Sequence, residues 1–511
     1  MDNKFYITTT LPYVNAPPHI GFALEIIQAD VIARYQRTLG KEVIFNFGTD
    51  EHGKKIFEKA QEQEMDVKVY CDEYAAKFDD LKKALNLSYT NFIRTTDEHH
   101  INAAQEFWKK CLANGDIYKK LYKTKYCVGC ELEKTDSELV GGKCPLHPNR
   151  ELELIEEENY FFRFSKYQKP LLDFYEANPD FVKPEGKFNE IKTFVAGGLD
   201  DFSVSRLRTK MPWGIDVPND PDHIMFVWFD ALINYISTLK WPENEENFRN
   251  FWPGLQVAGK DNLRQQTAIW QAMLMSAGLP NSKQVFIHGF LTVDGQKISK
   301  SLGNTINPIE LVEKYGTDPV RYFLLAHIHP CDDSDFSISK LEEAYNSDLA
   351  NGIGNLVSRV VGMIEKYCDG KIPQIESVAD SHPLRSDENI HNWKKVWKDI
   401  DKFTPIFQFD QAMGSVWKFI KEADRYVDEN KPWELVKSDM KKLNWVLYGL
   451  VDSLHQVAWQ IYPYLPETAI KIGKILGVEA LTVDNPNSKD SWTNLPPGRD
   501  IKIEQPLFPR I

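Results

Sequence analysis

The sequence predicts an α/β protein in which a doubly wound parallel sheet is split by an insertion and followed by an α-helix bundle. Three observations carry this prediction. Up to about residue 330, short apolar segments alternate with amphipathic helical segments. Residues 116–218 interrupt the alternation with a cysteine cluster and many Gly, Pro, Asp and Glu, and beyond about residue 346 long helical patterns dominate. Strand–helix alternation is typical of Rossmann-like parallel sheets, which carry helices on both faces.

The spacing of apolar residues predicts the individual elements. Three short apolar runs have strand length: residues 5–10, 42–47 and 284–288. Four longer stretches keep the three-to-four-residue spacing of a helix with a buried face: residues 23–39, 265–277, 409–430 and 442–462. The last two are long and follow one another closely, as in a helix bundle.

These sequence patterns divide the chain into six parts. The predicted parts are a first half of the Rossmann-type sheet domain, an insertion, the second half of the sheet domain, a linker, a helical domain and a tail: residues 1–115, 116–218, 219–310, 311–345, 346–480 and 481–511. A chain of 511 residues is long enough for several domains with separate cores.

Composition excludes several classes of protein. The chain has 42% hydrophobic and 26% charged residues, 28 Gly and 28 Pro, as in ordinary globular proteins. No apolar run of membrane-spanning length and no signal-peptide core occur, and seven cysteines do not form a disulfide framework. We therefore expect a cytoplasmic protein. The net charge of −13 argues against a general nucleic-acid binder.

The first chemical motif spans residues 10–22, where a strand ends, a Pro-rich loop follows and a helix begins. A helix N-terminus offers free N–H groups and a positive dipole end, which suit phosphate. Gly21 would let a phosphate approach the backbone, and His19 could donate a hydrogen bond to it. The alternative is a helix-entry loop with an incidental histidine.

A second motif spans residues 293–304. Asp294-Gly295 is a hairpin-turn signal, and Lys297 and Lys300 follow it among hydroxyl side chains. Two lysines on a mobile loop could grip a triphosphate. A Lys-rich surface loop without such a role is the alternative.

A third motif is the spacing C-x2-C-x13-C-x2-H, formed by Cys127, Cys130, Cys144 and His147. Three thiolates and one imidazole make a tetrahedral ligand set for zinc. Since all four positions are filled by protein, the predicted site is structural. We expect it to shape the insertion and to place the end of a bound partner, without a direct part in catalysis.

A fourth motif, residues 48–53, follows the strand at 42–47. A carboxylate at the carboxyl end of a parallel strand lies where open α/β sheets bind ligands, so Asp50 could hold an ammonium group. The alternative is a turn with a helix N-cap.

The segments around His19 and Lys297 occur together on an alternating α/β pattern. They resemble the two signature sequences of class I aminoacyl-tRNA synthetases, His-x-Gly-His and Lys-Met-Ser-Lys-Ser. Further segments are similar to methionyl-tRNA synthetases and follow that family's order: residues 8–13, 48–53, 226–232 and 259–261, the cysteine cluster, and residues 355–359 and 430–434. The resemblance covers roughly residues 4–475.

The resemblance implies a methionine–tRNA ligase. Such an enzyme converts L-methionine and ATP to methionyl adenylate and pyrophosphate, then passes the methionyl group to the 3′ end of tRNA(Met) and releases AMP. It implies Mg²⁺ with ATP, one structural Zn²⁺, a linker at 311–345 that contacts the tRNA stem, and an anticodon-binding domain at 346–480. In-line displacement at phosphorus mainly requires positioning and cations, so no side-chain nucleophile is needed. We expect a monomer, because no appended tRNA-binding module follows the helical domain.

The resemblance also assigns roles to individual residues. Asp50 would hold the ammonium group of methionine and Arg206 would face Asp50. The rest of the methionine site would be Leu11, Tyr13, Trp228, Ala231, Tyr235, Asp261 and Gln266. ATP would lie across His19 and Gly21, near His288 and Gly289, under Lys297 and Lys300. The anticodon would be read by Asn355, Arg359 and Trp433.

Two positions depart from the family pattern: Phe22 stands where the signature has its second His, and Gln266 stands where the methionine pocket usually has a His. Two alternatives therefore stay open. One is a catalytically impaired paralogue that binds tRNA. The other is a class I synthetase for another amino acid; the short insertion disfavours leucine, valine and isoleucine, and the position of the zinc motif disfavours cysteine.

Overall fold

The central sheet has six strands, all parallel, in the order β3-β2-β1-β12-β13-β7. The computed structural model describes residues 3–130, 132–134, 138–298, 303–375, 393–478 and 495–511. The strands are β1 (Lys4–Thr9), β2 (Glu42–Thr49), β3 (Asn91–Arg94), β7 (Val182–Lys183), β12 (Leu255–Gly259) and β13 (Gln284–His288). From β1 the chain first moves outward to β2 and β3 and later returns to add β12 on the other side. This order places a topological switch point between β1 and β12.

Alternate residues of these strands enter two different cores, as the period of two in a strand requires. Ile7 and Val257 belong to one core cluster, whereas Tyr6 and Ala258 belong to the other. The first core is covered by α1 (Ile20–Thr38) and α3 (Val67–Asp79), and the second by α5 (Glu98–Ala113) and α11 (Trp270–Ser276). The predicted doubly wound α/β fold is therefore confirmed.

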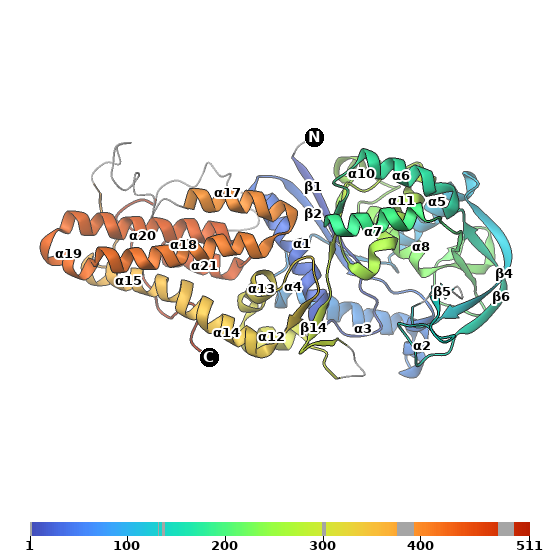
Figure 1. The fold of residues 1–511 in the computed structure, drawn as a ribbon, viewed down its shortest axis with the longest axis horizontal. Coiled ribbons are helices and arrows are strands. Elements are labelled where there is room, and N and C mark those ends of the chain that lie inside the picture. The colour runs from blue at the N-terminus through green and yellow to red at the C-terminus, as the bar shows by residue number, and fades with distance from the viewer. Residues whose placement is uncertain (1–2, 131, 135–137, 299–302, 376–392, 479–494) are drawn as a thin grey trace.

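The insertion is built around a long antiparallel pair, β4 (Ile117–Cys127) and β6 (Glu153–Phe162), flanked by β5 (Leu132–Lys134) and β8 (Phe202–Ser203). In Figure 1 this pair lies at the end of the molecule opposite the helical domain. The expected insertion at 116–218 also contains β7, which pairs with β13 and extends the parallel sheet. Part of the insertion thus belongs to the sheet domain in space.

A smaller antiparallel sheet completes this half of the molecule. It consists of β9 (Ser205–Leu207), β10 (Asp216–Val217) and β11 (Asp220–Met225). Two short helices follow β11 directly: α8 (Val227–Leu232) and α9 (Asn234–Ser237). The helix predicted at 265–277 is present, but its first part, Gln265–Ile269, has π-helical hydrogen bonding.

The C-terminal part of the chain is mainly helical, as predicted beyond about residue 346. Its principal helices are α12 (Pro308–Tyr315), α13 (Thr317–Ala326), α14 (Ile338–Ala344), α15 (Asn355–Tyr367), α17 (Trp393–Phe403), α18 (Phe409–Asn430), α19 (Pro432–Ser438), α20 (Met440–Ile461) and α21 (Pro466–Ile475). The helix predicted at 409–430 matches α18, and that at 442–462 matches α20 within two residues. Figure 1 shows α18 and α20 running side by side away from the sheet.

Arg321 of α13 joins the helical half to the sheet domain. Its guanidinium is fully buried and donates to Asp30 Oδ2 at 2.8 Å and to the carbonyl oxygens of Leu85 and Tyr464 at 3.1 and 2.8 Å. Asp30 also accepts from Arg34 Nε at 2.8 Å. Burial opposes ionisation of Asp30, but the two arginines outweigh it and lower its pKa to about 2.

Candidate active site

Four strand ends and the start of α1 form the candidate active site. β1, β2, β12 and β13 end at Thr9, Thr49, Gly259 and His288, on the same edge of the parallel sheet. Backbone hydrogen bonds tie two of the following loops together, because Asp50 N donates to Pro12 O and Val14 N donates to Asp50 O. The motifs at 10–22 and 48–53 are therefore neighbours.

His19 is the N-cap of α1. Its backbone is extended, with φ −129° and ψ 170°, and its Nδ1 accepts a hydrogen bond from Gly21 N at 3.1 Å. The proton of the neutral ring therefore lies on Nε2. Burial lowers the pKa of His19 to about 4, so the ring is neutral at pH 7 and offers one N–H donor.

Gly21 is required by this cap. A Cβ at position 21 would lie 2.9 Å from His19 Cε1, so any side chain would displace the imidazole. The sequence suggested that Gly21 leaves room for a ligand to approach. In the structure, the missing side chain first makes room for the imidazole of His19.

A cavity of about 240 Å³, which we call the α1 cavity, opens at this helix start. Its lining includes most of the residues expected to bind ATP, together with Ile298, which follows Lys297. Its lining is Thr10, His19, Gly21, Phe22, Leu24, Glu25, Gly259, Asp261, Asn262, His288, Gly289, Phe290, Leu291 and Ile298.

Glu25 lines the α1 cavity and joins two other lining residues by hydrogen bonds, although no motif predicted it. Its Oε1 accepts from Thr10 N at 2.8 Å and Thr10 Oγ1 at 2.6 Å, and its Oε2 pairs with His288 Nε2 at 2.9 Å. The other ring nitrogen of His288 lies 2.7 Å from Gly289 O. Burial works against protonation of His288, but Glu25 outweighs it and raises the pKa. Each ring nitrogen thus faces an acceptor oxygen. The sequence did offer one signal for this role: Glu25 is a carboxylate next to Leu24, which lies on the buried face of the predicted helix.

A second cavity of about 80 Å³, which we call the Asp50 cavity, adjoins the first, since Thr10 and Asn262 line both. The lining is Thr10, Leu11, Asp50, Trp228, Ala231, Leu232, Asn234, Tyr235, Asn262, Gln265 and Gln266. Six of the residues expected around methionine are thus brought together: Leu11, Asp50, Trp228, Ala231, Tyr235 and Gln266. Thr10, Asn234 and Asn262 were not assigned to the site, although Thr10 begins the first motif and Asn262 directly follows the segment 259–261.

Three other expected residues lie outside this lining. Asp261 lines the α1 cavity instead. Tyr13 donates its hydroxyl hydrogen to His52 O at 2.7 Å, and its backbone bridges to Asp50. Arg206 lines a neighbouring cavity that shares Trp228 and Gln265 with the Asp50 cavity. Its guanidinium donates to Ser203 Oγ at 2.7 Å. The expected role of Arg206 opposite Asp50 stays a prediction.

Gln266 is buried and fixes the hydroxyl of Tyr235. Its Nε2 donates to Tyr235 Oη at 2.6 Å, and its Oε1 accepts from Gln256 Nε2 at 3.1 Å. Because the hydroxyl accepts this bond, its own hydrogen can be donated to an atom in the cavity. Burial raises the pKa of Tyr235, so the phenol stays protonated.

The lysine motif forms a hairpin beside the α1 cavity. β14 (Leu291–Val293) and β15 (Gln296–Lys297) are antiparallel and joined by Asp294 and Gly295, which have φ of 50° and 75°. Two central residues with positive φ are the geometry of a type I′ turn, as Asp-Gly predicts. Lys297 directly precedes Ile298, which lines the α1 cavity. Lys300 lies outside the described residues.

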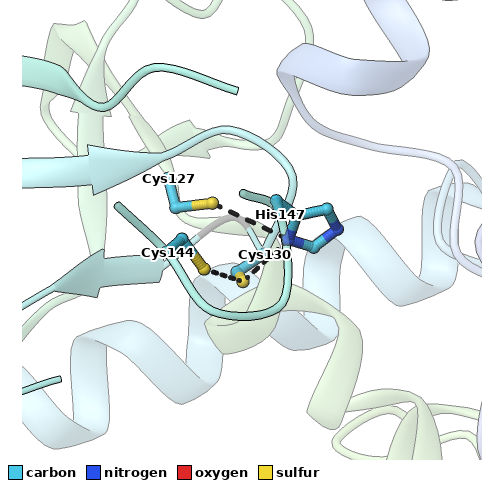
Figure 2. Close-up of side chains that lie close together, drawn as sticks. All are labelled: Cys127, Cys130, Cys144 and His147. Atoms are coloured by element: carbon cyan, nitrogen blue, oxygen red, sulfur yellow. Dashed lines mark hydrogen bonds between the residues drawn. The ribbon is translucent and has the colours of Figure 1, made fainter. Parts of the chain in front are cut away.

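The Cys127, Cys130, Cys144 and His147 side chains converge at the tip of β4 (Figure 2). All four potential ligand atoms lie within 4.8 Å of one another. Cys130 Sγ is 3.4 Å from Cys144 Sγ and 3.2 Å from His147 Nδ1, and Cys127 Sγ is 3.8 Å from the same nitrogen. A tetrahedron with zinc–sulfur bonds of about 2.3 Å has edges of about 3.8 Å, so the set fits zinc. A Cβ at Gly129 would lie 2.5 Å from His147 Cγ, which explains the glycine.

The metal-site loop packs against a wall of the Asp50 cavity. Tyr126 and Val128, on either side of Cys127, form a small core with Phe226 and Val227, and Trp228 packs on it. The conformation of this loop is therefore linked to the position of Trp228.

The geometry agrees with known proteins. The sequence profile of the tRNA synthetases class I (M) matches residues 5–151 and 147–361. The chain belongs to this family.

Relatives of the family resemble the whole chain. A methionine–tRNA ligase of Thermotoga maritima is 42% identical over 99% of this chain and 80% of its own length, and that of Synechocystis sp. is 39% identical over 99% and 97%. Mycobacterium tuberculosis methionyl-tRNA synthetase in complex with methionyl-adenylate has a TM-score of 0.93 at 36% identity, with 99% of this chain and 100% of that chain covered. The apo form of that enzyme has a TM-score of 0.85 at 34% identity, with 100% and 98% covered.

The expected anticodon readers of the family lie on the helical domain. Asn355 begins α15, and Trp433 lies in α19 with 42% of its surface exposed. Figure 1 places α19 at the end of the bundle farthest from the sheet. Arg359 donates to Asp424 Oδ1 at 2.6 Å and to Asp428 Oδ1 at 2.7 Å, so two carboxylates of α18 hold its guanidinium.

Within the described part of the chain, no helix has both the length and the apolar character that a membrane span requires.

Proposed function

We propose that the chain is a methionine–tRNA ligase that activates L-methionine with ATP and transfers it to tRNA(Met). One observation carries the proposal: a small cavity with a buried carboxylate adjoins a larger cavity at a helix N-terminus, and Thr10 and Asn262 line both. Activation requires this arrangement, because the carboxylate of the amino acid must attack the α-phosphorus of a neighbouring nucleotide.

The amino acid would lie in the Asp50 cavity. Asp50 is 7% exposed and offers a carboxylate for the ammonium group. Leu11, Trp228 and Ala231 supply apolar surface for an unbranched side chain. The Tyr235 hydroxyl hydrogen, left unused by the bond from Gln266, would be donated to the thioether sulfur, a weak acceptor.

ATP would lie in the α1 cavity. The Nε2–H of His19 and the positive dipole end of α1 would meet the phosphates, although the first N–H groups of the helix already have acceptors within the chain. His288 and Gly289 would border the adenine. Lys297 and Lys300 would add positive charge over the phosphates, and Mg²⁺ would arrive with ATP. The protein thus positions the reactants and stabilises developing negative charge, and no side chain need form a covalent bond.

The second step would transfer the methionyl group to the 3′-terminal ribose of tRNA(Met). Trp433, Asn355 and Arg359 would read the anticodon by stacking and by hydrogen bonds to base edges. We further propose one structural Zn²⁺ held by Cys127, Cys130, Cys144 and His147 Nδ1. A monomeric state and a cytoplasmic location remain predictions.

ATP–pyrophosphate exchange with a panel of amino acids tests the proposal. We expect exchange with methionine and none with leucine, isoleucine, valine or cysteine, followed by charging of tRNA(Met). Exchange with another amino acid would contradict the specificity. Tight tRNA(Met) binding without any exchange would instead support the impaired paralogue motivated by Phe22.

A further inference from the structure

A buried carboxylate links the walls of the Asp50 cavity. Asp230 of α8 is fully buried, and each of its oxygens faces a histidine: His52 Nδ1 lies 2.7 Å from Oδ2 and His100 Nε2 lies 2.8 Å from Oδ1. His100 is fully buried as well, and its Nδ1 lies 2.8 Å from Ser237 Oγ of α9. The proposed reaction uses none of these four side chains.

The hydrogen-bonding pattern suits an ionised Asp230. Each neutral imidazole can donate one N–H to the carboxylate, and Ser237 can donate its hydroxyl hydrogen to the remaining nitrogen of His100. Burial raises the pKa of Asp230, but the two histidines outweigh this effect and lower it. A buried carboxylate is costly unless it is paired, so Asp230 holds both rings firmly.

The groups joined in this way carry the two halves of the amino-acid site. His52 lies two residues after Asp50, on the loop that follows β2. Asp230 is next to Ala231 and two residues from Trp228 on α8, and Ser237 lies on α9 with Tyr235. One side would hold the ammonium group and the other the side chain of the substrate.

We propose that Asp230 is a positioning residue for amino-acid recognition: through His52 and His100 it sets the separation between Asp50 and the apolar wall formed by Trp228 and Ala231. The inference deepens the proposed function and rests on it. An amino acid held at both ends is accepted only when its length matches this separation.

The test compares exchange kinetics of matched variants. Asp230→Leu keeps a similar volume but removes both bonds, and we expect its KM for methionine to rise at least about tenfold while the KM for ATP stays within about twofold. His100→Gln places an amide N–H near the position of Nε2 and should stay near the wild type, whereas His100→Leu should behave like Asp230→Leu. For His52, whose Nδ1 is used, the corresponding pair is His52→Asn and His52→Leu.

Asp116→Asn is the control for a general loss of stability. Asp116 is also fully buried and accepts from Lys166, Tyr167 and Ser276, but it lies at the start of the insertion. We expect a lower thermal midpoint with an unchanged KM for methionine.

Three results would overturn the inference: parallel rises in both KM values, equal KM values for His100→Gln and His100→Leu, or a rise for Asp116→Asn like that for Asp230→Leu. If Asp230→Leu does not fold, the histidine pairs still decide. Absence of methionine-dependent exchange in the wild type would refute the proposed function, whereas wild-type exchange with unaltered variants would refute only the positioning role.

Discussion

The imidazole of His19 packs against the ring of Phe22, with 4.5 Å between the ring centroids and 37° between the ring planes. Phe22 in turn meets the edge of Phe78 at 5.8 Å. The residue that replaces the second signature histidine therefore supports the first, whose Nδ1 is already bound by Gly21 N. Gln266, the other departure, lines the Asp50 cavity, so the two changes belong to different cavities.

We therefore predict an active enzyme whose site is adapted to Phe22. Phe22→His should leave methionine-dependent exchange unchanged or lower it, because a polar ring against Phe78 weakens the support of His19. Phe22→Leu, which removes the aromatic contact, should lower kcat. His19→Ala is the reference for loss of the donor, with an expected drop of about 10²–10³-fold. A strong gain for Phe22→His would show that the native site is impaired.

Gln266 should affect methionine affinity through Tyr235. Gln266→Leu leaves Gln256 Nε2 without its acceptor and the Tyr235 hydroxyl without its donor, at a cost of about 1–3 kcal/mol. We expect the KM for methionine to rise about tenfold and the KM for ATP to stay unchanged. Gln266→His, which restores the usual family residue, can still donate to Tyr235 and should stay near the wild type. Equal KM values in all three proteins would contradict this role.

Loss of zinc should affect both methionine activation and tRNA charging, to different extents. Cys144→Ser should lower the metal content well below the one zinc per chain that we expect in the wild type. Because the loop shapes the insertion, tRNA charging should fall most, and through Trp228 the KM for methionine should rise severalfold. Elemental analysis and exchange assays on the same preparations check this. A zinc-free wild type with full activity would exclude the structural metal site.

Trp433→Ala should affect charging alone. Loss of an exposed stacking surface costs about 1–3 kcal/mol per base, so charging of tRNA(Met) should fall roughly 5- to 150-fold. The proposed site of methionine activation lies in the sheet domain, so methionine-dependent exchange should not change. Ile406→Ala is the matched control, because Ile406 has the same 42% exposure in the helical domain. A parallel loss of exchange would contradict the division of labour between the domains.

Stability should depend on Asp30 in a pH-dependent way. Its pKa of about 2 lies below the ordinary value of 3.8 for an aspartate side chain, so the unfolded chain binds the proton first as pH falls. The resulting stabilisation, about 2 kcal/mol, is complete above pH 3.8 and is lost as pH falls through 2. Thermal midpoints of wild type and Asp30→Asn should therefore differ most near neutral pH, with the difference narrowing below pH 4. A constant difference across this range would contradict the assignment.

Much of the fold could be predicted because its signals are local. The spacing of apolar residues placed β1, α1, α18 and α20 within a few residues, since helix and strand periods depend only on near neighbours. The Asp-Gly turn before Lys297 was predictable for the same reason. β7 could not be assigned to the sheet from the sequence, because two residues are too few to show the alternation of a strand. Its place in the sheet depends on pairing with β13, which is distant along the chain.

Site residues divide in the same way. The four residues of the candidate metal site were found from spacing, and about half of the residues that line the two cavities were found from resemblance. Glu25 and Asp230 were not found, because their meaning depends on partners far along the chain: His288 is 263 residues from Glu25, and His52 is 178 residues from Asp230.

By itself the sequence determined the α/β class, the helical C-terminal part, the four residues of the candidate metal site and the family resemblance, because each depends on residues close together in the chain or on short motifs. Only the tertiary structure decided which side chains share a cavity. Strand order brings the ends of β1, β2, β12 and β13 to one edge of the sheet, where burial favours pairing of polar groups that are distant along the chain. That long-range requirement produced the Glu25–His288 pair, the Gln266–Tyr235 bond and the two histidines on Asp230.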